Sequence, residues 1–268
     1  MFRLRDHVIS LVAVFLALGL GIIIGTGISE DMLVKQQRLL IDQMTTDFSS
    51  LREERMQLEA RLQTVSRDIY LWEKYQEALY PGIVTGVLRE RKIAIIYHAT
   101  TIPQSVLTLI QDGEAKLCSV IGVQDKTALG ENTGDLASIL TALTVGDEFG
   151  DDKEKQLATY LTTGAVNVEI ATTEKPDTVL LLVGERGSID KNIVTTVTQS
   201  LQQAQVTVIG LEWSDIKSSL LGDLKAAGIS TIDNAETVFG QFSLLSVLRG
   251  SAGSYGIKES ADELMATF

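Results

Sequence analysis

The chain of 268 residues contains one cysteine, three prolines and two histidines. Because Cys118 stands alone, no disulfide can form within one copy of the chain. Soft-metal sites need clustered thiolates, thioethers or imidazoles, and the sequence offers few of these. Lys and Arg number 23 against 35 Asp and Glu, which gives a formal charge of −12. This acidic balance argues against a nucleic acid partner, whose phosphates would be repelled.

Local motifs of common enzymes are also missing. No glycine-rich fingerprint follows the first predicted strand, and no Gly-x-Ser-x-Gly elbow follows any strand. The stretch GSAGSYG at 250–256 has the small residues of a phosphate loop. It follows a helix and lacks Gly-Lys-Ser/Thr, so we interpret it as a turn. We predict that the protein is not an enzyme, and its residues identify no cofactor.

What the sequence does contain is an uninterrupted apolar run, Val8–Ile28, behind Arg3 and Arg5. As a helix the run would be about 31 Å long, which matches a hydrocarbon core of about 30 Å. The competing interpretation is a cleaved secretory signal. Basic residues before the run, and Glu30 and Asp31 after it, favour a cytoplasmic N-terminus. We therefore predict a single-pass protein of the cell membrane with most of the chain outside the cytoplasm.

Beyond this run, apolar residues follow a heptad pattern from Met44 to Leu79. The steps between them alternate between four and three residues, which is the spacing of a coiled coil. Arg55 and Gln76 fall at a positions, where polar residues lower stability but restrict register. We predict a homo-oligomeric stalk; in the alternative, this face packs on the globular part of the same chain. The residues expected to mediate oligomerisation are Leu51, Leu58, Leu62, Val65 and Ile69 in the stalk, with the small-residue ridge Ala17, Gly21 and Gly25 in the apolar run.

Pro81 and Gly82 predict the end of the stalk. From there, short continuous apolar runs alternate with helical segments, as expected for strands buried on both faces. The pattern predicts an α/β fold with a mostly parallel, three-layer sheet of Rossmann-like or flavodoxin-like type. Strands are predicted at 92–97, 116–123, 178–184 and 206–211, and helices at 103–111, 135–144, 152–162, 190–203, 220–227 and 237–248. The expected domains are a membrane anchor at 1–29, a coiled-coil stalk at 30–80 and an extracytoplasmic α/β domain at 81–268.

Ligands of such sheets bind outside the carboxyl ends of the strands. His98 follows the first predicted strand and is the only histidine beyond the apolar run, so it is the candidate metal ligand. A hard-cation site among Glu185, Glu212 and Asp215 is an alternative, although solvated loop carboxylates are far commoner.

Two stretches carry a resemblance to a known family. Leu4-Arg5-Asp6-His7, followed by SLVAVFLALGLG at 10–21 and by Gly25, resembles the N-terminal signature of the MctB-type copper transporter family. The stretch GSYGIK at 253–258 resembles that family's closing segment, with Ala261, Asp262 and Leu264. The resemblance implies an envelope protein that takes part in copper efflux or homeostasis, and copper is the only metal it implies. It transfers no catalytic or metal-ligand residue.

Transport by one copy of the chain meets a physical objection, because one membrane helix cannot enclose an aqueous path. Transport therefore requires oligomers or a channel partner in the envelope. In the closing segment, Ser251 and Ser254 stand among small residues where some relatives carry histidine, which argues against copper coordination there. The alternative function is that of a non-enzymatic, membrane-anchored coiled-coil scaffold or regulator of the envelope.

Overall fold

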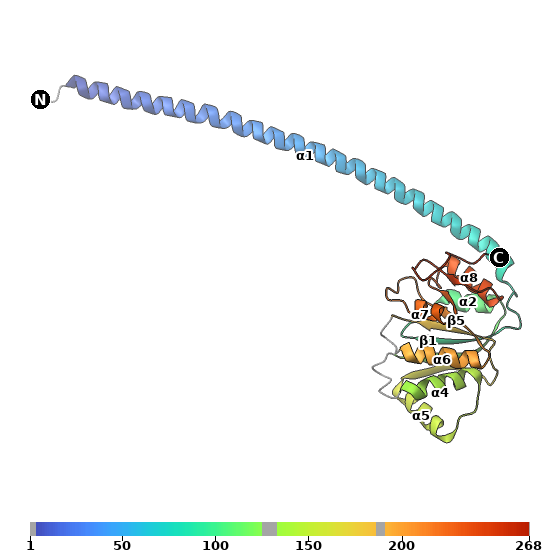
Figure 1. Cartoon of the computed structure of the whole chain (residues 1–268). Coiled ribbons are helices and arrows are strands. Elements are labelled where there is room, and N and C mark those ends of the chain that lie inside the picture. The colour runs from blue at the N-terminus through green and yellow to red at the C-terminus, as the bar shows by residue number, and fades with distance from the viewer. Residues whose placement is uncertain (1–3, 125–132, 186–190, 268) are drawn as a thin grey trace. The chain divides into compact units, whose positions relative to one another are not determined.

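The computed structural model of the chain describes residues 4–124, 133–185 and 191–267 (Figure 1). Of residues 4, 26–33, 133 and 134 it describes the backbone alone. The chain divides into two compact units, Met1–Gln76 and Glu77–Phe268. The first unit is helical, whereas the second contains a sheet covered by helices. Each unit is described by itself.

Helix α1 begins at Leu4 and ends at Val84, so the predicted stop at Pro81-Gly82 is wrong. Proline lacks an N–H, and the helix therefore loses one backbone hydrogen bond at Pro81. The helical pattern continues regardless, since Thr85 N donates to the Pro81 carbonyl at 3.1 Å. Val84 is 2% exposed and packs in a core cluster of the second unit. Burial of this last turn offsets the missing hydrogen bond.

The second unit alternates strands and helices, as the sequence predicts. Each of the four predicted strands and six predicted helices is found, with ends that differ by one or two residues where the structure describes them. The strands are β1 Lys92–His98, β2 Lys116–Val123, β3 Val166–Ala171, β4 Thr178–Val183, β5 Thr207–Leu211, β6 Ser230–Ile232 and β7 Ser254–Tyr255. The helices are α2 Gln104–Asp112, α4 Thr133–Val145, α5 Asp151–Thr163, α6 Lys191–Gln203, α7 Leu221–Ala226 and α8 Val238–Leu248.

In the described part of the chain, the strands form one sheet in the order β3-β2-β1-β4-β5-β6-β7. Neighbouring strands run parallel, except that β3 pairs with β2 in the antiparallel sense. A mixed α/β fold with a mostly parallel sheet is therefore confirmed. Strands β3, β6 and β7 were not predicted from the sequence, because β3 is mostly exposed and the other two are three and two residues long.

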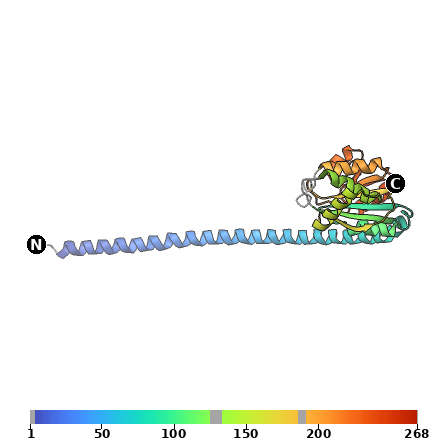
Figure 2. The ribbon, with the colours of Figure 1, turned by 90° about the horizontal axis from the view of Figure 1, so that it is seen from below.

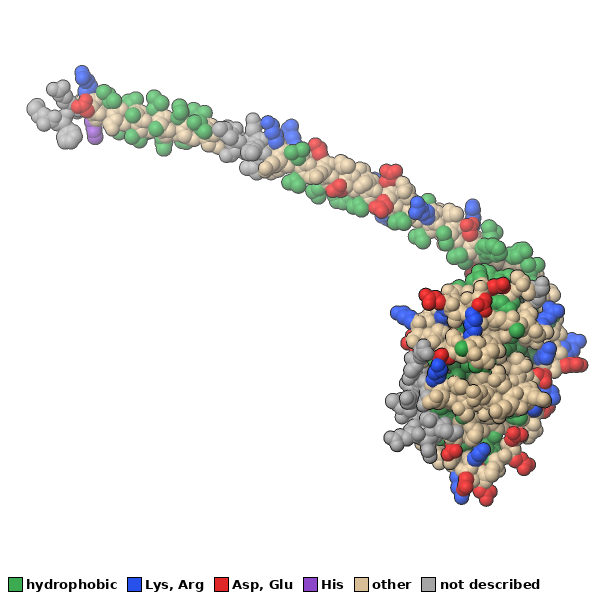
Figure 3. Space-filling model, in the orientation of Figure 1, with side chains coloured by type: hydrophobic (Ala, Val, Ile, Leu, Met, Phe, Trp, Pro, Cys, Tyr) green, Lys and Arg blue, Asp and Glu red, His purple; other side chains and the backbone are tan. Residues whose placement is uncertain are grey.

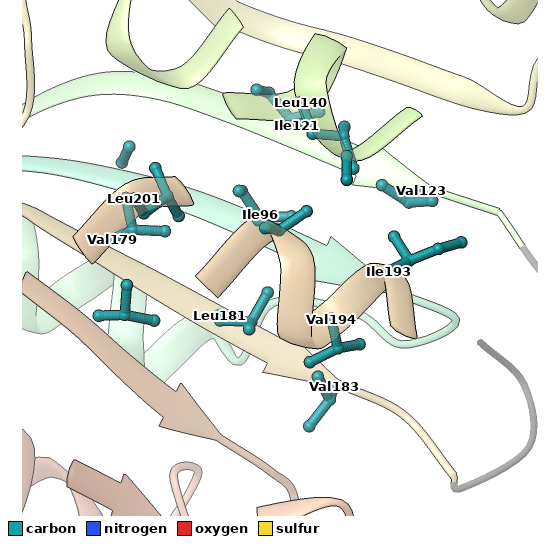
Figure 4. Close-up of a cluster of buried hydrophobic side chains, with 14 of the residues drawn as sticks. Ile96, Ile121, Val123, Leu140, Val179, Leu181, Val183, Ile193, Val194 and Leu201 are labelled. Carbon is teal, nitrogen blue, oxygen red and sulfur yellow. The ribbon is translucent and has the colours of Figure 1, made fainter. Parts of the chain in front are cut away.

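Alternate residues of the central strands face opposite sides of the sheet. Ala94 and Ile96 of β1 belong to one hydrophobic cluster, whereas Ile93 and Ile95 belong to another. The first cluster includes side chains of α4, α6 and α7, among them Leu140 (Figure 4). The second includes side chains of α2, α8 and the last turn of α1. Helices thus cover both faces of the sheet, which explains why its central strands are apolar without alternation (Figure 2).

Candidate functional site

The N-terminal part of α1 has the properties of a membrane span. Residues Arg5–Gly25 form a 21-residue stretch with a mean hydropathy of 2.8, and none of it is buried. Among the described helices, it is the one long and apolar enough to cross a membrane, judged by length and composition. Its large apolar side chains are exposed along the segment (Figure 3). These exposed side chains would be stable in hydrocarbon and unfavourable in water.

The small-residue ridge lies on this segment and is open in a single copy. No heavy atom lies within 4 Å of the position that a Cβ would occupy at Gly21 or Gly25. Ala17 is one helical turn before Gly21, and its side chain is exposed as well. A second helix could therefore approach the backbone closely along this line. Pairing at the ridge remains a prediction.

A second exposed feature is the heptad face farther along α1. The five stalk residues predicted to mediate oligomerisation lie between 53% and 65% exposed in a single copy. They share one side of the helix because they are three, four or seven residues apart, as in a heptad pattern. A coiled coil would bury this face, and its formation stays a prediction. The five residues are Leu51, Leu58, Leu62, Val65 and Ile69.

His98, the candidate metal ligand, closes β1 at the centre of the sheet. It pairs with Val123 of β2 on one side and with Val183 of β4 on the other, and it is 1% exposed. Its carbonyl accepts a hydrogen bond from Gly184 N at 3.0 Å. A Cβ on Gly184 would lie 2.7 Å from the carbonyl oxygen of Ala99, so the two chain segments meet backbone to backbone. The histidine is therefore enclosed by the sheet rather than presented on a loop.

The described residues bring no soft-metal ligands together at His98. No group of three or more His, Cys, Asp or Glu side chains in this part of the chain could hold a metal ion. Strand pairing places Ser119 beside Ala94 and Val123 beside His98, so Cys118 lies roughly 16 Å from His98 along the sheet. Burial raises the pKa of the Cys118 thiol, which disfavours the thiolate that binds metal.

The hard-cation alternative depends on Glu212, whose carboxylate already has protein partners. Glu212 is 1% exposed and follows β5 directly. Its Oε1 accepts from Leu220 N at 2.8 Å, and its Oε2 accepts from Lys258 Nζ at 2.9 Å. Asp215 and Glu185 are exposed, so they do not join it in a buried site. The positive charge beside the Glu212 carboxylate is therefore the ammonium group of Lys258.

Lys258 belongs to a polar network that holds the closing stretch against the carboxyl ends of β5 and β6. Its Nζ also donates to the Trp213 carbonyl at 3.0 Å. The buried Asp233 carboxylate accepts from Ile257 N at 2.7 Å and from Lys258 N at 2.8 Å. Gly256 has φ 141°, and a Cβ there would overlap the Asp233 carboxylate. Because every named group has a partner within the fold, we interpret the network as structural.

Sequence reasoning missed this network, although one signal pointed to it. Glu212 and Lys258 lie 46 residues apart, so no local spacing reveals their contact. The resemblance of the closing stretch 253–258 marked it as a defined motif without giving its partner. The structure supplies that partner at the carboxyl ends of two neighbouring strands.

Comparisons with known proteins give a family. The model of the family described as "Copper transport outer membrane protein, MctB" matches residues 1–209 and 130–266, which together cover nearly the whole chain. No curated protein matches the sequence.

Proposed function

Because the chain belongs to the MctB copper transport outer membrane protein family, with a role in copper transport or homeostasis at the cell envelope, we propose how it fulfils that role. It acts as a single-pass anchored, non-enzymatic protein whose copies assemble through α1. Its N-terminus is cytoplasmic and its α/β unit lies outside the cytoplasm. The apolar segment Arg5–Gly25 is the observation that supports this proposal most strongly.

The proposal limits how copper can move. One membrane helix has no lumen, and its backbone groups bond within the helix, so a single copy offers no polar path. Copper must therefore cross through an assembly, formed by several copies or with a channel partner. The small-residue ridge and the exposed heptad face of α1 support assembly, because both leave apolar surface open in a single copy.

The α/β unit serves recognition rather than chemistry in this proposal. Its strand order, β3-β2-β1-β4, supports the predicted Rossmann-like sheet, in which β3 would run in the reverse direction. Such sheets bind ligands where the strand order changes direction, here between β1 and β4. At this point Gly184 packs directly against the backbone of Ala99. The non-enzymatic role is part of the proposal.

A gene deletion tests the copper role. Cells without the gene should accumulate copper or become sensitive to it, while their zinc sensitivity should not change. The full-length gene should restore the native copper level, and a version with charged residues at Leu16 and Leu20 should not, because it cannot insert. Unchanged copper content in the deletion strain would contradict the proposed role.

Direct copper binding is a separate question with its own measurement. The purified full-length protein in detergent would be titrated with Cu(I) without oxygen, and with Cu(II) separately, by calorimetry. Stoichiometric binding that disappears in His98→Ala would make His98 a ligand. Absence of binding of either ion would place copper contact on a partner.

The second candidate function is that of an envelope scaffold or regulator. It is favoured by the exposed heptad face combined with the absence of a metal-holding cluster among the described residues. This candidate predicts that deletion alters envelope integrity at constant cellular copper, whereas the copper role predicts the reverse.

A further inference from the structure

One part of the α/β unit contains most of its exposed apolar side chains. Beyond α1, eight large apolar side chains of the described residues are exposed, and five of them lie at the start of α8 or in the closing stretch after β7. Exposed apolar clusters of this kind are typical of interaction sites. These five side chains are 36% to 63% exposed and form the apolar patch, which consists of Val238, Phe239, Ile257, Leu264 and Met265.

Hydrogen bonds hold the closing stretch on the first turns of α8. Ala266 N donates to Ser243 Oγ at 3.1 Å, and Ser243 Oγ donates to the Phe239 carbonyl at 2.8 Å. Gly256 N donates to the Glu263 carbonyl at 2.9 Å, so the patch residue that follows each of these two lies in a neighbouring segment. The parts of the apolar patch, which are distant in sequence, thus meet on one surface.

The composition of α8 is that of a helix covered on all sides. Its 11 residues, VFGQFSLLSVL, include no charged side chain. A helix that is apolar all round is expected to be buried. Residues Ser243–Leu248 are buried as expected, whereas Val238 is 40% and Phe239 is 47% exposed. The start of α8 therefore has the composition of a covered surface but is exposed in a single copy.

Acidic residues outnumber basic ones around the apolar patch. Lys258 is paired with Glu212, and Lys225 of α7 is paired with Asp262 at 2.6 Å. Arg249 lies ten residues after Phe239, or about 15 Å along α8. Residues 233–267 contain five acidic residues and two basic ones, namely Asp233, Glu236, Glu259, Asp262 and Glu263 against Arg249 and Lys258.

Two glutamates beside the apolar patch have no countercharge. Glu259 and Glu263 are exposed, and neither carboxylate has an ion-pair partner among the described residues. Each lies one or two residues from a member of the apolar patch. The loop after β5 adds one charge of each sign, Asp215 and Lys217, and so no net charge. The surface around the patch therefore carries an excess of negative charge.

This excess of negative charge selects among the occupants that an apolar surface could have. A second copy of the chain would bring the same carboxylates to a symmetric contact, where they would repel one another. Anionic lipid headgroups would be repelled in the same way. A protein segment with apolar side chains flanked by lysine or arginine would cover the apolar surface and pair with the carboxylates.

We propose that the apolar patch binds such a basic, apolar segment of another envelope protein, with Glu259 and Glu263 as its ion-pair partners. The inference rests on the proposed function in one respect, because a single membrane helix needs an assembly to move copper. It gives the partner in that assembly a binding surface and a chemistry. The apolar side chains supply most of the affinity, and the carboxylates discriminate against acidic partners.

Site-specific photocrosslinking in intact cells tests the proposal. The crosslinking residue p-benzoylphenylalanine would replace Leu264 in the full-length chain, or Leu161 as the control, which is 45% exposed on α5. Irradiation should join position 264, but not position 161, to one other protein. Mass spectrometry should locate the crosslink in an apolar segment that contains lysine or arginine. A crosslink to a second copy, a crosslink to lipid, or the absence of a crosslink specific to position 264 overturns the proposal.

The role of the carboxylates is measured in the same assay. Glu259→Gln combined with Glu263→Gln should lower the crosslink yield severalfold, because each exposed ion pair changes affinity by about two- to fivefold. Glu148→Gln combined with Asp152→Gln is the matched control, since it removes two exposed carboxylates elsewhere on the unit and should leave the yield unchanged. Equal yields from the two double variants would refute the role of charge.

The apolar contribution is tested by Phe239→Ser, with the crosslinking residue again at position 264. Loss of this aromatic side chain should lower the yield about tenfold. Leu161→Ser should leave it unchanged. Both replaced side chains are about half exposed, so both variants should keep the melting temperature of the native chain. If folded Phe239→Ser gives the same yield as Leu161→Ser, the apolar patch is not the binding surface.

The outcomes are separate from those of the copper test. A deletion that raises cellular copper, together with no crosslink at position 264, would refute the binding surface alone. A crosslink that depends on both glutamates, together with unchanged copper in the deletion strain, would refute the copper role alone.

Discussion

At the residue scale, Glu212 and Lys258 form the most enclosed ion pair among the described residues, with side chains 0% and 15% exposed. Replacing Lys258 by Met would leave the Glu212 carboxylate buried without its countercharge. We expect the free energy of unfolding to fall by about 3–5 kcal/mol, as measured by urea denaturation. Adding Glu212→Gln should recover most of the loss, because the uncompensated charge is then removed.

Lys225→Met is a matched control for this prediction. Lys225 pairs with Asp262, which is 61% exposed, so its loss should cost less than about 1 kcal/mol. If the two lysine variants lose equal stability, the buried pair has no special role.

The environment of Tyr80 leads to a prediction about the stability of the protein at alkaline pH. Burial, and secondarily the negative charge of Asp112, raise the pKa of Tyr80 from 10.0 to about 12. The fold therefore disfavours the ionised form of Tyr80. The stability that arises from this pKa difference between the folded and unfolded chain is fully present below pH 10 and is lost as the pH rises through about 12. Tyr80→Phe should flatten the fall in melting temperature between pH 10 and 12. Tyr70→Phe, at an exposed position, should leave that fall unchanged.

At the element scale, the last turn of α1 belongs to the core of the α/β unit. Val84 at the end of α1 is 2% exposed and Leu88, in the turn that follows, is 0% exposed; burying each such side chain contributes about 1.5–3 kcal/mol. A fragment of residues 77–268 should fold cooperatively. A fragment of residues 89–268 lacks both side chains and should be less stable by about 3–6 kcal/mol, or unfolded. Urea unfolding followed by far-UV circular dichroism compares them, and equal midpoints would contradict this role of the turn.

The sequence predicted the buried elements better than the exposed or short ones. β1, β2, β4 and β5 are found because each is a continuous apolar run covered on both faces. β6 and β7 are too short for any periodic pattern. The helix does not end at Pro81, although local propensity favours an end there, because Val84 packs in the core of the α/β unit.

The candidate site was less predictable than the fold. His98 stands at the end of a central strand as expected, since strand ends follow from the apolar pattern. Its enclosure depends on the approach of Gly184, 86 residues later, and no local pattern encodes that contact. The same holds for Lys258 and Glu212, which only the folded sheet brings together.

At the scale of the whole molecule, assembly through α1 predicts that charge in the seam separates the copies. Leu58→Asp combined with Leu62→Asp should convert the detergent-solubilised dimer to a monomer, because four carboxylates would enter an apolar interface. Gln57→Asp with Ala60→Asp adds the same charge on the outer side of the helix and should leave the dimer intact. Mass by analytical ultracentrifugation distinguishes them. A native chain that is monomeric at micromolar concentration contradicts the prediction.

The late position of Lys258 has a consequence for biogenesis. A nascent chain that has reached Glu212 but not residue 258 contains a carboxylate whose burial is not yet compensated by its lysine. At about 5–20 residues per second, the 46 intervening residues take about 2–9 s to synthesise. During that interval the Glu212 carboxylate lacks its ammonium partner, and we expect the sheet to be less stable at the end of β5. This charged contact at the sheet edge thus forms only when nearly all of the α/β unit has been made.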